Sequence, residues 1–137
     1  MKRCKHFRIE ELVPPELFQL VKVDTLWELF DEKLLITIDA LKEKFPDGSM
    51  YINNWLWGLD REQSGLRTKN SEYYSPSSMH SLGKAIDCVF THYKTEEVRK
   101  YVINNPKKFP HIKGIEKDVS WLHIDTRLSD RVVVFSA

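Results

Sequence analysis

The stretch from Ser78 to Asp87 constrains the fold of this chain most. It reads Ser-Met-His-Ser-Leu-Gly-Lys-Ala-Ile-Asp, so a histidine and an aspartate lie seven residues apart, with a glycine and an alanine between them. The sequence from Ala85 to Phe90 is typical of a buried strand, on which Asp87 faces the same side as Val89. A buried carboxylate is costly unless a cation pairs with it. We therefore expect a metal ion or an arginine beside Asp87; the alternative is that Asp87 caps a turn at the end of the strand.

A second stretch near the C-terminus, Ser120 to Asp125, complements the first. It is predicted to form a strand with its tryptophan, histidine and aspartate on one face. Catalytic zinc sites use three protein ligands, drawn from imidazole nitrogen, thiolate sulfur and carboxylate oxygen, and leave one position open. His80, Asp87 and His123 would form such a set around one zinc ion, and Gly83 would allow the tight turn between the first two.

The size and charge of the chain limit its organisation and its partners. Its 137 residues, 42% of them hydrophobic, suit one domain spanning residues 1–137, which we expect to be a monomer. The net charge of +1 predicts no nucleic-acid partner. No stretch reaches the ~18 apolar residues of a membrane span, and no signal peptide opens the sequence, so synthesis in the cytoplasm is expected. Cys4 and Cys88 are interpreted as free thiols in a reducing compartment.

The N-terminal part, residues 1–49, is expected to be helical. Paired prolines predict a short helix from Pro15 to about Val21. The clearest helix is capped by Asp31 and ends before Gly48. One apolar stripe recurs along it at helical spacing and predicts its packing face against a sheet: Leu34, Ile38, Leu41 and Phe45.

Residues 50–137 are expected to carry the sheet and the metal site. Strands are predicted at 50–57, at 85–90, at 120–125 and at 131–135, with a helix that Thr95 caps and Pro106 ends. Two asparagines interrupt the first of these strands and indicate either a bulge or an early strand end. The long polar loop 58–78 is typical of a functional segment. This order predicts an α+β fold, a small and mostly antiparallel sheet flanked by helices, with the zinc site on the sheet.

Together the two motifs, Ser-x-His-x-x-Gly-x-Ala-x-Asp and Trp-x-His-x-Asp, resemble those of the zinc peptidases that act on cell-wall peptides. That superfamily includes D-Ala-D-Ala carboxypeptidases and dipeptidases and phage L-alanyl-D-glutamate endolysins, and the hedgehog signalling domain shares its fold. The resemblance covers roughly residues 50–127. It implies that His80, Asp87 and His123 bind zinc and that the substrate is a peptidoglycan stem peptide. Such an enzyme would reach the cell wall after release from the cytoplasm, as in phage lysis.

The resemblance also implies a role for Arg67. The segment Ser64 to Arg67 matches the family's Ser-Gly-aromatic-Arg, with Leu66 in place of the aromatic residue. In that family the arginine faces the substrate and stabilises a developing oxyanion or a substrate carboxylate, which a planar guanidinium suits. Without the resemblance, Arg67 would be interpreted as a surface arginine in a polar loop.

One position departs from the family pattern. Many members carry a glutamate three residues before the last histidine ligand as the general base, and Ser120 occupies that position here. Serine cannot take this role without a base of its own. We therefore rank Asp118 first as the base, Glu116 second and Asp125 third; Asp125 shares a strand face with the histidine and is alternatively a residue that orients it. If no acid reaches the zinc, the chain is a non-catalytic, zinc-containing binding module on the same fold.

Overall fold

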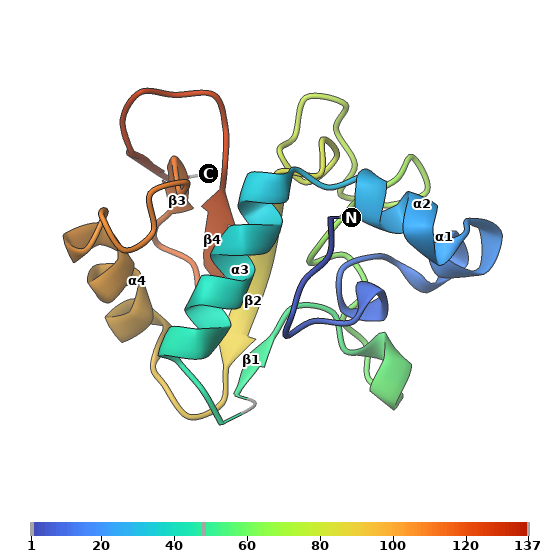
Figure 1. Cartoon of the computed structure of the whole chain (residues 1–137), viewed down its shortest axis with the longest axis horizontal. Coiled ribbons are helices and arrows are strands. Elements are labelled where there is room, and N and C mark those ends of the chain that lie inside the picture. The colour runs from blue at the N-terminus through green and yellow to red at the C-terminus, as the bar shows by residue number, and fades with distance from the viewer. Residues whose placement is uncertain (1, 48, 137) are drawn as a thin grey trace.

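The computed structural model of this chain describes residues 2–47 and 49–136. The first part is helical and the second contains all five strands of the sheet, so the predicted α+β class is confirmed (Figure 1). The elements in chain order are the 3-10 helix η1 (Ile9–Glu11), α1 (Pro15–Leu20), α2 (Val23–Glu28), α3 (Glu32–Lys44), β1 (Met50–Tyr51), the 3-10 helix η2 (Trp55–Trp57), β2 (Ala85–Phe90), α4 (Thr95–Asn104), β3 (Gly114–Glu116), β4 (Leu122–Asp125) and β5 (Val133–Phe135).

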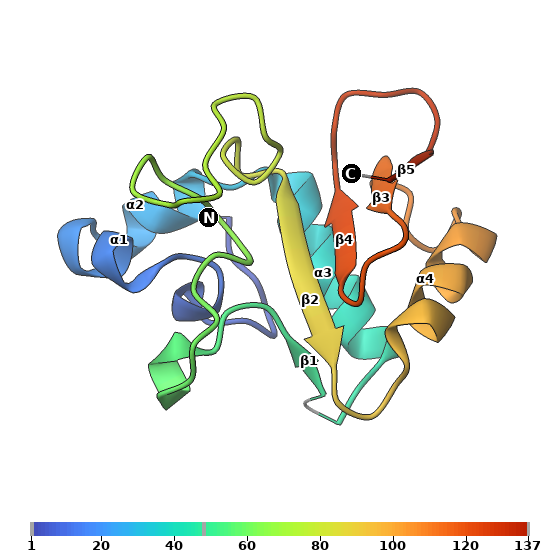
Figure 2. The same cartoon turned by 180° about the vertical axis from the view of Figure 1, so that it is seen from behind.

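The sheet has five strands in the order β1-β2-β4-β3-β5. The first three neighbouring pairs are antiparallel, but β5 runs parallel to β3. The sheet is therefore mixed, which corrects the expectation of a small, mostly antiparallel sheet. The reason is that β4 already has β2 and β3 as neighbours. The chain returns from β4 through residues 126–132 in the antiparallel direction, joins the outer edge beyond β3, and so lies parallel to it (Figure 2).

Helix α3 covers one face of the sheet and forms the core with it (Figure 1). The predicted stripe is buried. Leu34, Ile38 and Leu41 are fully inaccessible to solvent, and Phe45 is 9% exposed. Alternate positions on the central strands supply the sheet's share of this core: Ile86, Cys88, Ile115, Leu122 and Ile124. Because side chains alternate along a strand, the positions between them point to the opposite face.

Asp31 caps α3 as predicted and also connects it to the sheet. One carboxylate oxygen accepts a hydrogen bond from the backbone N–H of Lys33 at 3.3 Å. The other accepts one from the hydroxyl of Thr126, directly after β4, at 2.6 Å. The backbone N–H of Asp31 donates to the carbonyl of Gly83 at 2.9 Å, which ties the turn before β2 to the start of the helix.

The strand expected at residues 50–57 ends at Tyr51, which is the early end that the two asparagines left open. The chain leaves the sheet at the two asparagines and continues into η2. The Asn53 side chain donates to the carbonyl of Val13 at 3.1 Å and accepts from the backbone N–H of Ser64 at 2.9 Å. These hydrogen bonds take the place of strand pairing and hold the following loop against the N-terminal part. Strand β3 was not predicted, because three residues are too few to show an alternating pattern.

The two cysteines lie outside the candidate site. Cys4 and Cys88 are free thiols, and burial raises the pKa of each above its usual range, so neither is a reactive thiolate at neutral pH.

Among the helices of residues 2–47 and 49–136, none is both long and apolar enough to cross a membrane.

Candidate metal centre

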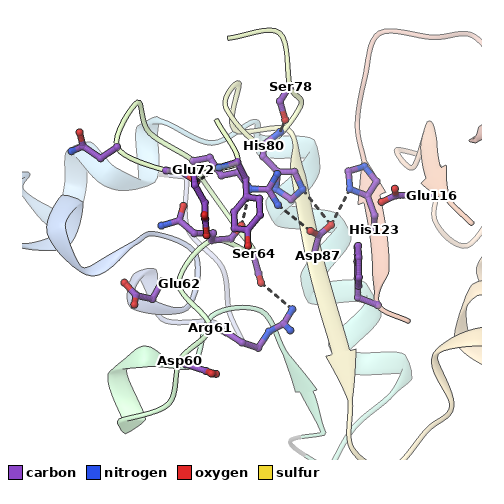
Figure 3. Close-up of a pocket in the computed structure, with 16 residues that line it drawn as sticks. Asp60, Arg61, Glu62, Ser64, Glu72, Ser78, His80, Asp87, Glu116 and His123 are labelled. Atoms are coloured by element: carbon purple, nitrogen blue, oxygen red, sulfur yellow. Dashed lines mark hydrogen bonds and ion pairs between the residues drawn. The ribbon is translucent and has the colours of Figure 1, made fainter. Parts of the chain in front are cut away.

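Three polar side chains form a row across the sheet, on the face opposite α3 (Figure 3). The antiparallel register pairs Asp87 of β2 with His123 of β4, and the same histidine with Glu116 of β3 on its other side. Directly opposed residues on neighbouring strands have their Cβ atoms about 5 Å apart. The sheet register, rather than loop folding, therefore brings the aspartate, the histidine and the glutamate together.

His80 joins this row from the turn that precedes β2. The turn requires a glycine at position 83, where φ is +69°, in the left-handed region. A Cβ atom there would also lie 2.1 Å from the carbonyl oxygen of Leu29, which leaves no space for a side chain. The turn places His80 Nε2 3.2 Å from Asp87 Oδ1.

The two histidines approach the same oxygen of Asp87. His80 Nε2 lies 3.2 Å and His123 Nδ1 2.9 Å from Asp87 Oδ1, and the three candidate ligand atoms all lie within 4.8 Å of one another. All three residues are buried, at 3%, 8% and 7% exposure for His80, Asp87 and His123. A tetrahedral ion with bonds of 2.0–2.1 Å holds its ligand atoms about 3.3 Å apart. This buried group could therefore hold a metal ion.

The second nitrogen of each imidazole has its own hydrogen-bond partner. His80 Nδ1 lies 2.9 Å from the carbonyl oxygen of Gly65, and His123 Nε2 lies 2.8 Å from Asp125 Oδ2. A carbonyl oxygen only accepts, so Nδ1 of His80 carries a proton, and Nε2 is the nitrogen that faces Asp87 and would bind a metal ion. Partners of this kind fix the tautomer and the orientation of metal-binding histidines.

The charges of the group favour a carboxylate and a protonated imidazole when no metal is bound. Burial opposes ionisation of Asp87, but hydrogen bonds from His123 and His80 outweigh it and hold the pKa of Asp87 well below its usual range. Burial also disfavours the charged form of His123, yet hydrogen bonds to Asp125 and Asp87 raise its pKa to about 9. A metal ion entering the site would displace this proton.

Arg67 lies beside the candidate ligands. Its Nη2 is 3.2 Å from Asp87 Oδ2, its Nε donates to the carbonyl of Gln63 at 2.8 Å, and its guanidinium lies 5.6 Å from the ring centre of Tyr73. Burial lowers the pKa of Arg67, and the charge of Asp87 opposes this shift. The backbone N–H of Asp87 donates to the carbonyl of Ser64 at 2.8 Å, so the segment carrying Arg67 is held alongside β2.

The group opens into a cavity of about 950 Å³. Two polar atoms of cavity-lining residues, Gln63 Oε1 and Trp121 Nε1, are buried without a hydrogen-bond partner among the described residues. Buried polar atoms are normally satisfied, so a bound ligand is one source of the missing partners. The charged lining residues other than the three candidate ligands are Asp60, Arg61, Glu62, Arg67, Glu72 and Glu116.

The three acids considered as general base have different surroundings. Glu116 is 8% exposed, lines the cavity and lies beside His123 (Figure 3). Asp118 is exposed, accepts a hydrogen bond from the Ser136 hydroxyl at 2.5 Å and is not among the cavity-lining residues. Asp125 is fully buried on the far side of His123. The geometry thus favours Glu116 over Asp118, the reverse of the order expected from the sequence.

Sequence reasoning missed Arg99 of α4, which holds the connection between β3 and β4. This buried arginine donates to the backbone carbonyls of Glu116 at 3.1 Å, Val119 at 3.0 Å and Trp121 at 2.6 Å. An arginine beside apolar helix positions carries no signal of this role, because its partners are backbone atoms about 20 residues away in sequence.

Comparison with known proteins does not assign the chain to a family. No family model, no curated protein and no solved structure matches it. The resemblance of the two motifs to cell-wall zinc peptidases therefore stays a prediction, and the geometry of the group is the main ground for assigning a function.

Proposed function

We propose that this protein is a zinc-dependent peptidase that hydrolyses peptide bonds in peptidoglycan stem peptides. The observation that carries the proposal is the row of Asp87, His123 and Glu116 beside His80 in one cavity. Two imidazole nitrogens and one carboxylate oxygen are a donor set that suits catalytic zinc. When bound, zinc would lower the pKa of a water molecule toward neutrality and polarise the substrate carbonyl.

Glu116 is the proposed general base. It lines the cavity and is paired across the sheet with His123, so its carboxylate lies at the metal-binding group without any loop movement. It accepts a proton from the attacking water and donates it to the leaving amine as the peptide bond breaks. This assignment accounts for the serine at position 120, because the acid comes from the neighbouring strand instead.

Arg67 is the proposed electrostatic partner of the substrate. Its guanidinium is held by Asp87 and the carbonyl of Gln63 and lines the cavity. Its donors stabilise the negative charge that develops on the carbonyl oxygen, or bind a substrate carboxylate. A group fixed before the reaction needs no reorganisation when that charge appears.

The choice of stem peptides rests on the resemblance of the two motifs, together with the charged lining of the cavity. Acidic and basic side chains both line it, which suits a short peptide that carries free amino and carboxyl groups. Activity on the cell wall requires that the protein leaves the cytoplasm, as it would during phage lysis.

The test is digestion of purified peptidoglycan by the zinc-loaded protein, analysed by mass spectrometry. A chelator-treated sample and the zinc-loaded Glu116→Gln variant are the controls. We expect new stem-peptide ends only with the zinc-loaded wild-type protein. The masses of these ends identify the cleaved bond. Bound zinc without new ends would contradict the peptidase and favour the non-catalytic binding module, which sedimentation of the protein with intact peptidoglycan would then detect.

A further inference from the structure

We propose that Asp125 and Arg127 are positioning residues that select Nδ1 of His123 as its metal-binding atom. The inference rests on the proposed function only in so far as both require a metal at this group. It excludes Asp125 as the general base. It also means that residues after β4 help to orient a candidate metal ligand.

The carboxylate of Asp125 is fully engaged and fully buried. Its Oδ2 lies 2.8 Å from His123 Nε2 and accepts from Arg127 Nη2 at 2.7 Å, while its Oδ1 accepts from Arg127 Nε at 2.8 Å. Its exposure is 0%. A bidentate arginine keeps the carboxylate ionised, so it remains an acceptor for the Nε2 proton. With both oxygens occupied, it has no oxygen free to take a proton from water.

The sheet leaves a space of fitting size for this carboxylate. Asp125 is paired with Ala85 on β2 and with Gly114 on β3, two of the smallest residues. A Cβ atom on Gly114 would lie 2.2 Å from Asp125 Oδ1. Asp125 therefore lies between a glycine and an alanine on the neighbouring strands, and their small side chains leave space for its carboxylate.

Strand β5 covers the outer side of this arrangement. The ring of Phe135 lies 5.6 Å from the ring of His123, at an interplanar angle of 79°. The guanidinium of Arg127 lies 4.8 Å from the ring centre of Phe135, within the range of a cation–π contact. The parallel edge strand thus packs an aromatic ring on both the histidine and the arginine.

The consequence concerns which nitrogen of His123 is available. A neutral imidazole carries one proton, and the acceptor that faces one nitrogen decides which nitrogen keeps its lone pair. Because Asp125 accepts the proton on Nε2, Nδ1 is left to face Asp87 and the cavity. A charged acceptor also raises the basicity of the ligand, and loss of such a partner typically weakens metal affinity by about 10–100-fold.

The test measures zinc affinity by competition with a chromophoric chelator, and the visible absorption spectrum of the cobalt-substituted protein. We expect Asp125→Ala to weaken zinc binding by about 10–100-fold and to change the cobalt spectrum. Asp125→Asn retains an oxygen that can accept the Nε2 proton, so it should recover part of the affinity. Asp118→Asn, an acid outside the cavity, is the matched control and should bind zinc as the wild type does.

The outcomes separate this inference from the proposed function. Wild-type zinc affinity and an unchanged cobalt spectrum in Asp125→Ala would overturn the positioning role, whether or not peptides are cleaved. Zinc binding without cleavage, with a weakened Asp125→Ala variant, would overturn the peptidase and support the positioning role. If Asp125→Ala does not fold, Asp125→Asn and Arg127→Gln decide: weaker zinc binding in folded protein supports the inference, and unchanged binding in both overturns it.

Discussion

His123 lies between two carboxylates whose distances to its ring are almost equal and whose surroundings are opposite. On one side, Asp87 is 2.9 Å from Nδ1 and lines a cavity of about 950 Å³ together with His80 and Glu116. On the other side, Asp125 is 2.8 Å from Nε2, sealed by Arg127 and completely buried. We call these the open side and the sealed side of the histidine.

The difference shows that the same functional group takes a different task when its environment changes. Asp87 has one oxygen facing two imidazole nitrogens, beside a cavity from which an ion can enter. Asp125 has both oxygens bonded to fixed donors and no exposed surface, so it can only hold the ring in place. Proximity to the histidine alone does not separate a ligand from a positioning residue; the accessible volume and the remaining partners do.

The largest expected effect is the loss of the metal from the open side. His80→Ala and His123→Ala should each abolish stoichiometric zinc binding, because two remaining protein ligands do not form a catalytic zinc site. Zinc content after dialysis, measured by elemental analysis, checks this. His111→Ala, which changes a histidine outside the cavity, is the control and should retain one zinc per chain. A full complement of zinc in either ligand variant contradicts the ligand assignment.

The next largest effect distinguishes Glu116, which lines the cavity, from Asp118, which does not. Glu116→Gln should lower turnover by about 10²–10⁴-fold while zinc content stays the same, since an amide cannot accept the proton. Asp118→Asn should leave turnover unchanged, because this carboxylate is exposed and bonded to Ser136. Steady-state rates on a stem peptide check both variants. Normal turnover in the glutamate variant with loss in the aspartate variant would restore the order expected from the sequence.

A third prediction uses the histidine with no metal present. The pKa of His123 rises from an ordinary 6.5 to about 9 in the folded state. Since folding raises this pKa, the stabilisation is fully present below pH 6.5 and is lost as the pH rises through about 9. The metal-free protein should lose up to roughly 3 kcal/mol of unfolding free energy between these limits. Urea unfolding at several pH values in chelator checks this.

His123→Gln is the matched variant for the pH prediction, because glutamine does not titrate. Its unfolding free energy should vary much less across the same pH interval. An equal loss of stability in wild type and variant would show that another group is responsible.

The smallest expected effect concerns the space beside Asp125, on the sealed side of His123. Gly114→Ala places a methyl group against Asp125, and such overpacking typically costs about 1–3 kcal/mol. Thermal unfolding and zinc affinity should both decrease. Gly58→Ala is the control: its φ of +85° is left-handed, so the substitution strains the backbone there, but nothing lies within 4 Å of the added atom. The control should lose some stability and keep its zinc affinity; equal zinc affinity in both variants would show that the space beside Asp125 is unimportant.

Local patterns predicted several elements because their signals are contained within short segments. The apolar stripe and the cap of α3 and the full extent of β2 follow from residues next to one another in sequence. The fixed spacing of the first motif marked His80 and Asp87, and a strand pattern marked His123. The structure brings these three together in a buried group.

The choice of acid was beyond the sequence because it depends on strand pairing. Glu116 belongs to a strand of three residues, and only the register of β3 on β4 places it opposite His123. Asp118 is nearer to the histidine in sequence but follows the end of that strand and faces solvent. Distance along the chain is a poor guide where neighbouring strands set the distance in space.

The sequence by itself determined the α+β class, the main helix, the central strand and the residue types of a candidate metal-binding group, because period, capping and ligand chemistry are local properties. Only the tertiary structure decided the mixed sheet, the position of Glu116 at the cavity and the sealing of Asp125 by Arg127 and Phe135. Each of these depends on which strands become neighbours and in which register. That choice is a property of the whole packed chain, since a strand edge is available or occupied only once the others have taken their places.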